Sequence, residues 1–181
     1  MIEIRDQYGD ERRTEIVPVD MDFSMEDMIA EEEVVLTITH QGYIKRTALN
    51  TYRTQRRGGR GVQGAMSKEE DFVEHLFIAN THNYMLFFTD QGKCYWLKVY
   101  DIPQGGRAAR GRAIVNLIGC DPGEKIEAFV SVKEFDDNHY IAMATRNGIV
   151  KKTVLSAYGK PRKGGIYAIE IRDGDKLIEA R

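Results

Sequence analysis

The chain has 181 residues, with 26 Lys and Arg against 28 Asp and Glu, and its formal net charge is -2. This length allows one sizeable core that needs neither a disulfide nor a metal to be stable, and Cys94 and Cys120 form no C-x-x-C pair that would favour either. No apolar run approaches the roughly 18 residues of a membrane span, and the N-terminus is charged where a signal peptide would be apolar. We therefore expect a soluble, cytoplasmic protein that contacts no membrane and holds no metal.

The first 33 residues predict a linker. They carry 12 acidic and 3 basic side chains around few apolar positions. Ser24 followed by Glu26 and Asp27 is typical of a helix start, since the helix dipole favours acids in the first turn. We expect a lead-in over residues 1–33 with one short helix near its end.

Three later segments share one pattern, which is an apolar run, a threonine, a polar pair and a glycine. The segments are residues 34–45, 84–95 and 140–151. A glycine supplies the positive φ of a tight turn, and β-branched and aromatic residues on both sides favour strands. Each segment therefore predicts a β-hairpin, and the turns fall at Gly42, Gly92 and Gly148.

A second pattern follows each hairpin. Ten residues beyond the three glycines lie Tyr52, Ile102 and Tyr158, and after each comes a stretch rich in glycine and basic residues. These stretches are 55–61, 105–112 and 160–165, and the short runs after them (62–66, 113–118 and 166–171) predict further strands. Residues 72–80 and 126–132 predict strands between the repeats.

A unit of about 50 residues with four short strands has the size of a propeller blade. We predict an all-β fold of about three propeller-like blades in an incomplete ring over residues 34–181. The repeats fall at approximately 34–82, 83–138 and 139–181.

Charge follows the same repeat. Residues 34–66 hold 6 basic and no acidic side chains, and residues 141–168 again hold 6 basic and none acidic. Glycine lets a backbone approach a phosphate chain, and arginine can fork onto phosphate oxygens with two hydrogen bonds. One such segment is equally typical of a solvated flexible loop. Its return at the same offset in three repeats favours a track for a polyanion.

The stretch Gln55-Arg-Arg-Gly-Gly-Arg-Gly61 resembles the gyrase A box, and the chain is similar to the carboxy-terminal domain of the DNA gyrase A subunit over essentially its whole length. Residues 8–16, 40–45, 70–72, 79–82 and 110–117 carry the resemblance as well. It implies a β-pinwheel, a disc of propeller-like blades whose basic rim wraps DNA, with the box helping to close the ring. It also implies that the chain supports ATP-dependent negative supercoiling by a type IIA topoisomerase.

Under this resemblance the DNA contacts are the box and the basic side chains of each repeat. They are Gln55, Arg56, Arg57, Gly58, Gly59, Arg60 and Gly61 with Lys45 and Arg46 in the first blade; Lys93, Lys98, Arg107, Arg110 and Arg112 in the second; and Lys151, Lys152, Arg162 and Lys163 in the third.

The resemblance also implies the partners, which are double-stranded DNA, the gyrase B subunit and a second A subunit in an A2B2 holoenzyme. None of the nine tyrosines lies in the Arg-Tyr-Thr context of the family's DNA-cleaving nucleophile. We therefore expect no catalytic residue and no cofactor in this chain, and ATP and Mg²⁺ to be used through other regions.

Three other interpretations stay open. The equivalent domain of the topoisomerase IV A subunit shares the blades, although the intact box argues against it. A propeller could serve as a protein-interaction platform whose basic loops only add solubility. An array of Arg-Gly segments could bind RNA, which competition between duplex DNA and single-stranded RNA would reveal.

Overall fold

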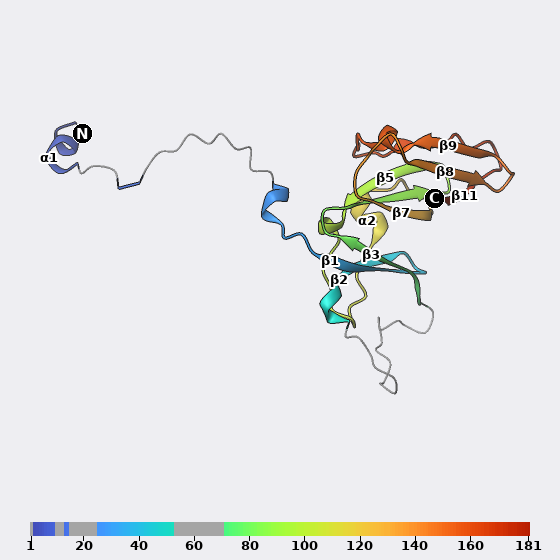
Figure 1. Ribbon diagram of the computed structural model, residues 1–181, viewed down its shortest axis with the longest axis horizontal. Helices are drawn as coiled ribbons and strands as arrows, with labels where there is room; N and C mark the ends of the chain where they lie inside the picture. Colours follow the sequence, from blue (N-terminus) through green and yellow to red (C-terminus); the bar gives the residue numbers. More distant parts are fainter. Residues whose placement is uncertain (1, 10–12, 15–24, 53–70) are drawn as a thin grey trace.

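The structure, a computed structural model, describes residues 2–9, 13–14, 25–52 and 71–181. Its described strands form three antiparallel sheets, which lie one above another in Figure 1. The predicted all-β, propeller-like fold is confirmed. No helix within the described ranges is long and apolar enough to cross a membrane.

Each sheet is built on one predicted hairpin. The first has the order β3-β1-β2-β6, with β1 at Glu33–Thr39, β2 at Tyr43–Ala48, β3 at Val73–Asn80 and β6 at Arg112–Ala113. The second has the order β10-β5-β4-β7, with β4 at Tyr84–Thr89, β5 at Lys93–Lys98, β7 at Ile126–Val132 and β10 at Ile166–Tyr167. The third has the order β11-β8-β9, with β8 at Tyr140–Thr145, β9 at Val150–Val154 and β11 at Leu177–Ala180.

The threonine of the repeated pattern closes each hairpin turn. In the first hairpin, the Gly42 amide donates to the Thr39 carbonyl at 2.8 Å, and the Tyr43 amide donates to the Thr39 hydroxyl at 3.2 Å. Thr89 and Thr145 accept the same pair of hydrogen bonds in the other two hairpins. The threonine thus supplies a side-chain acceptor at the position where the ladder stops, while the glycine supplies its positive φ.

The second sheet is the middle layer, and both of its faces are buried. Met85 and Phe87 pack into a core shared with the first sheet, whereas Leu86 and Phe88 pack into a core shared with the third. All four side chains are 0% exposed. This double burial explains why β4 has a continuous apolar run and no alternation of polar and apolar residues.

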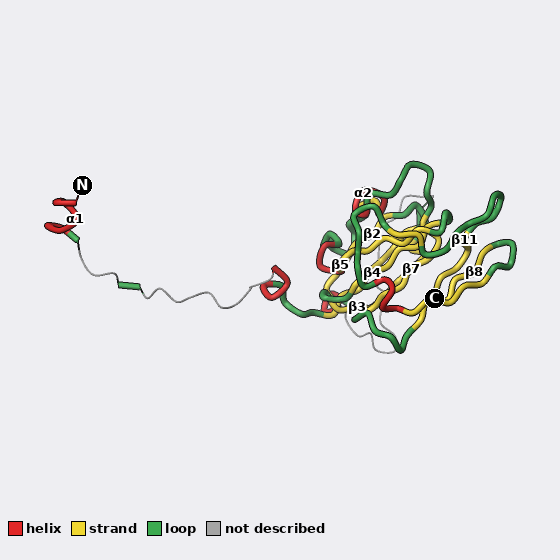
Figure 2. Tube along the Cα trace, turned by 90° about the horizontal axis from the view of Figure 1, so that it is seen from above, coloured by secondary structure: helices red, strands yellow, loops and turns green. Residues whose placement is uncertain are grey.

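In each of the first two sheets, one of the two outer strands comes from the following repeat, an arrangement that we call strand exchange. β6 pairs with β2, with Ala113 opposite Tyr43, and β10 pairs with β5, with Ile166 opposite Cys94. Figure 2 shows the sheets from above. A sheet is therefore not the same set of residues as a sequence repeat.

A glycine immediately precedes each exchanged strand. Gly111 has φ +90°, and a Cβ there would lie 2.4 Å from the carbonyl oxygen of Ile44. Gly165 has φ +69°, and its Cβ would lie 3.0 Å from the carbonyl oxygen of Cys94. Because Ile44 and Cys94 are equivalent positions on β2 and β5, both glycines are needed where the donated chain crosses the receiving strand.

Two predicted strands are much shorter than expected. In 113–118 only Ala113 is a strand residue, and Ile114–Ile118 is a helix, α2, that ends in a left-handed Gly119. Ile114 and Ile118 are both buried one helical turn apart, so the apolar run follows a helical period. In 166–171 the strand stops at Tyr167, and residues 62–66 lie outside the described residues.

The remaining helices are short. The lead-in contains α1 at Ile2–Tyr8, which the sequence pattern does not predict, and the 3-10 helix η1 at Met25–Met28, where a short helix is predicted. Three further 3-10 helices follow the hairpins, namely η2 at Leu49–Thr51, η3 at Val99–Asp101 and η4 at Leu155–Tyr158. Ile102 and Tyr158, two of the three residues singled out ten positions after a glycine, are 0% and 1% exposed.

Candidate nucleic-acid interface

The basic loop of the second repeat lies on the sheet of the first. We call residues 105–112 the arginine loop, because it carries Arg107, Arg110 and Arg112. The amide of Gly105 donates to the Arg46 carbonyl at 2.9 Å, and the loop then leads into β6 on the edge of the first sheet. The sequence repeat assigns these three arginines to the second blade, and strand exchange places them on the first.

Arg110 is held at the hairpin turn of the first sheet. Its guanidinium carbon lies 3.8 Å from the centroid of the Tyr43 ring, and its Nη2 donates to the Gln41 side-chain oxygen at 2.6 Å. Its Nε lies 3.9 Å from Oδ2 of Asp71, a carboxylate that also accepts the Gln41 amide. The Arg110 side chain keeps 40% of its surface exposed, so a fixed guanidinium faces solvent there.

Arg107 and Arg112 are exposed on either side of Arg110. Three guanidinium groups within six residues on a glycine-rich loop form a local concentration of positive charge. Guanidinium groups bind phosphate oxygens through paired hydrogen bonds, which makes this loop suited to a polyanionic backbone.

Lys45 has a different position from the one expected of a phosphate contact. It is 2% exposed, and its Nζ donates to the carbonyl oxygens of Gly106, Arg107 and Ala109 at 3.1, 2.7 and 2.9 Å. Burial lowers the pKa of this amine below its ordinary value. Its ammonium group thus lies beneath the arginine loop and does not face solvent.

Lys93 and Lys98 are both engaged by acidic side chains. Lys93 Nζ forms an ion pair with Asp121 and another with the buried Glu124 at 3.1 Å. The hydrogen bond to Asp121 raises the pKa of Lys93 above its ordinary value, with burial acting against it. Lys98 Nζ donates to Glu26 of the lead-in at 2.6 Å and lies 3.9 Å from the Tyr84 ring centroid. Their charge is therefore largely compensated within the protein.

The basic residues of the third repeat divide into two groups. Arg162 and Lys163 are exposed in the loop that leads to β10 on the second sheet, which is the position that the arginine loop has on the first. Lys151 and Lys152 lie on β9, where Lys151 donates to the Ala168 carbonyl at 2.6 Å and Lys152 lies 3.9 Å from the Tyr140 ring centroid.

The same kind of hydrogen bond joins adjacent repeats at two places, and its donor is each time the side chain four residues after a hairpin glycine. Arg46 Nε donates to the Ile102 carbonyl at 2.7 Å, and Trp96 Nε1 donates to the Tyr158 carbonyl at 2.8 Å. Arg46 thus uses its guanidinium at least partly at the seam between repeats. The equivalence of Trp96 to Arg46 in the aligned hairpins is the sequence signal that could have revealed this contact.

The gyrase A box residues Gln55, Arg56, Arg57, Gly58, Gly59, Arg60 and Gly61 lie outside the described residues. Their role stays a prediction from the sequence.

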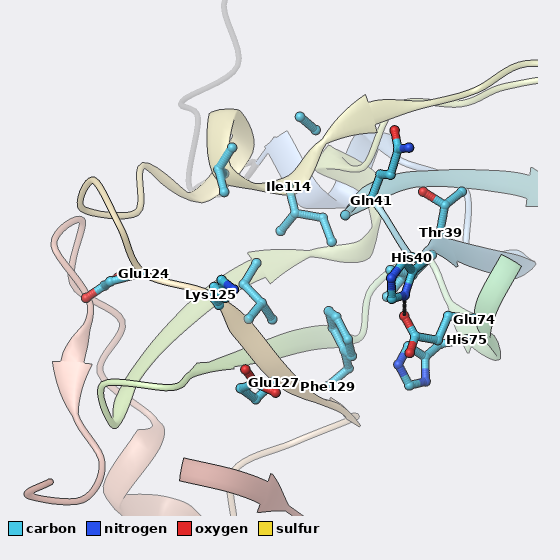
Figure 3. A pocket seen from close by; sticks show the side chains of 15 residues that line it. Thr39, His40, Gln41, Glu74, His75, Ile114, Glu124, Lys125, Glu127 and Phe129 are labelled. Atoms are coloured by element: carbon cyan, nitrogen blue, oxygen red, sulfur yellow. Dashed lines mark hydrogen bonds and ion pairs between the residues drawn. The ribbon is translucent and has the colours of Figure 1, made fainter. Parts of the chain in front are cut away.

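A cavity of about 490 Å³ opens between the first and second sheets (Figure 3). Its lining includes His40, Glu74, His75, Glu127 and Phe129. His40 Nδ1 lies 3.2 Å from Glu74 Oε2, the interaction drawn as a dashed line in Figure 3. The carboxylates make this cavity unsuitable for phosphate, so it is not part of the candidate interface. The described residues contain no group of three or more side chains placed to hold a metal ion.

Comparison with known proteins identifies the repeats. The family described as DNA gyrase C-terminal domain, beta-propeller, matches residues 33–80, 83–133 and 139–181. Relatives named as the A subunit of DNA gyrase are 52% identical to the chain in Clostridium acetobutylicum, covering 99% of the chain and 22% of the relative, and 51% identical in Neisseria gonorrhoeae, covering 98% and 19%. The chain thus spans about a fifth of the length of these relatives.

Solved structures give the same architecture. The C-terminal domain of DNA topoisomerase IV aligns with a TM-score of 0.71 at 32% identity, over 85% of this chain and 46% of that one. The DNA gyrase A C-terminal domain aligns with a TM-score of 0.63 at 25% identity, over 82% of this chain and 47% of that one. The two solved structures share one fold and belong to both enzymes, whereas the relatives near 50% identity over nearly the whole chain are A subunits of DNA gyrase.

Proposed function

The chain belongs to the DNA gyrase C-terminal domain family, and on that premise we propose that it binds duplex DNA and wraps it as part of the A subunit of a gyrase. In this proposal the wrapped segment is presented for ATP-dependent negative supercoiling by a type IIA topoisomerase. The holoenzyme is A2B2 and cytoplasmic, with ATP and Mg²⁺ bound elsewhere and no catalytic group in this chain.

The arginine loop is the observation that carries this proposal. Strand exchange sets one basic, glycine-rich loop on the edge of the first sheet and another, with Arg162 and Lys163, on the edge of the second. Adjacent sheets therefore present cationic side chains at equivalent positions. A repeated cationic edge suits the regular phosphate spacing of a duplex better than a single small ligand.

The energy of bending explains why several loops are needed. Smoothly bending a site of 20–30 base pairs by 40–90° costs on the order of 1–6 kcal/mol. Contacts to about six phosphates give a slope of log affinity against log salt near -5. Sequence preference is weak, because phosphate contacts carry no direct base information.

A salt titration with charge-matched variants tests the proposal. Arg107→Gln with Arg112→Gln removes two charges from the arginine loop, whereas Lys125→Gln with Lys133→Gln removes two exposed charges outside the basic stretches. We expect the first pair to reduce the salt slope of duplex binding by about 2 and the second to leave it nearly unchanged. Equal slopes in the two double variants would contradict the assignment of the interface.

The box is tested in the reconstituted holoenzyme. Changing Arg56, Arg57 and Arg60 together to alanine should reduce wrapping and supercoiling while the sheets stay folded. Unchanged supercoiling would refute their role. The related topoisomerase IV domain, which aligns with a TM-score of 0.71, is the second candidate, and a reconstituted holoenzyme that introduces no negative supercoils would favour it.

A further inference from the structure

The arginine loop is a glycine-rich segment that would be costly to order by itself. Gly105, Gly106 and Gly111 give it wide backbone freedom. Ordering a loop and its long side chains on binding costs affinity. A loop that is already fixed in the free protein avoids most of that cost.

Two buried side chains of β2 fix the loop from beneath. Lys45 Nζ has three donors, and three carbonyl oxygens of the loop accept them within 3.1 Å. Two positions further along the strand, the Thr47 hydroxyl donates to the Gly105 carbonyl at 3.0 Å. Both side chains are 2% exposed, so these bonds are shielded from water. Carbonyls that converge on a buried ammonium anchor the loop through its backbone and leave its guanidinium groups outside.

The loop and its anchor come from different repeats. Lys45 and Thr47 belong to the first hairpin, whereas the loop follows the second hairpin, and the three carbonyls that Lys45 binds are 61 to 64 residues away from it in sequence. The hairpin also supplies Tyr43 and Gln41, which hold Arg110. The cationic site on the first sheet is thus composite, with charges from one repeat and their support from another.

We propose that Lys45 is a positioning residue for DNA binding, which acts by holding the carbonyls of the arginine loop so that Arg107, Arg110 and Arg112 are preorganised for phosphate. The inference rests on the proposed function and refines it. Lys45 itself contacts no phosphate.

Lys45→Met tests this role, because it removes the ammonium group and keeps an unbranched side chain. Duplex affinity is measured across a salt series in the full-length protein, with Lys133→Met, an exposed lysine, as the matched control. We expect Lys45→Met to weaken binding on the order of tenfold with an unchanged salt slope, since every phosphate contact is retained. Amide exchange of residues 106–111 should be faster in Lys45→Met than in the Lys133→Met control.

Thr47→Val provides a second test that changes no charge and can still be measured if Lys45→Met does not fold. It should also weaken binding at constant slope and speed exchange of the same amides. A fall of about 0.9 in the slope for Lys45→Met would mean a direct phosphate contact and overturn the inference. Unchanged exchange in both variants would overturn it as well. If the parent protein binds no duplex, the proposed function fails, and the exchange data still decide whether Lys45 anchors the loop.

Discussion

Gly111 offers a direct test of strand exchange, because the cost of adding one methyl group there can be separated into two parts. The residue has φ +90°, and the new Cβ would lie 2.4 Å from the Ile44 carbonyl oxygen. Gly42 shares the positive φ, at +77°, yet a Cβ there would meet nothing within 4 Å. Gly106, in the same loop as Gly111, has neither a positive φ nor a neighbour within 4 Å.

Alanine at these three positions should give three different free energies of unfolding. Gly106→Ala is expected to be neutral or to stabilise by up to about 1 kcal/mol, by restricting the unfolded chain. Gly42→Ala should destabilise by about 1–2 kcal/mol, which is the cost of a left-handed alanine. Gly111→Ala should cost about 3–5 kcal/mol, because the same strain is joined by the loss of two or three hydrogen bonds of β6, each worth about 1 kcal/mol.

The measurement is denaturant unfolding of the full chain, followed by circular dichroism and by the fluorescence of its single tryptophan, Trp96. If Gly111→Ala were within about 0.5 kcal/mol of Gly42→Ala, the range of an ordinary surface change, the close crossing over Ile44 would have no energetic importance. Strand exchange would then not depend on a glycine at this position.

Two further outcomes follow from the same packing. Trp96→Phe removes the donor to the Tyr158 carbonyl and should lower the free energy of unfolding by about 1–2 kcal/mol. Tyr140→Phe is the control and should change this free energy little, because the Tyr140 side chain is 48% exposed. Equal effects of the two substitutions would speak against the contact between repeats. Burial raises the pKa of Cys120 to about 11 and raises that of Cys94 further, so both thiols are protonated at pH 8. Iodoacetamide should therefore alkylate them far more slowly in the native chain than in the unfolded chain, which mass spectrometry measures.

Local patterns are sufficient to predict the hairpins. Each turn needs a glycine at positive φ three residues after a threonine, and both residues belong to one short stretch of sequence. The strands β3 and β7 are also predicted closely, because each is a run of strand-forming residues between polar turns. Short-range chemistry decides these elements.

The candidate site could not be predicted to the same depth, because its geometry depends on strand exchange. A strand of two residues, such as β6, has no period that reveals which sheet it joins. The basic loop of one repeat therefore lies on the sheet of the previous one, with Lys45 as its buried anchor. The ion pair of Lys98 could not be predicted for a similar reason, since its partner Glu26 lies 72 positions away in the lead-in.

Strand exchange also sets the order of events on the ribosome. Tyr43 and its partner Ala113 are separated by about 70 residues. At a synthesis rate of about 5–20 residues per second, β2 therefore remains without its partner strand β6 for roughly 4–14 s. During that interval β2 presents an open edge that another nascent chain could pair with. Lys45 and Arg46 lie on this edge strand, and their charges disfavour such pairing until β6 arrives.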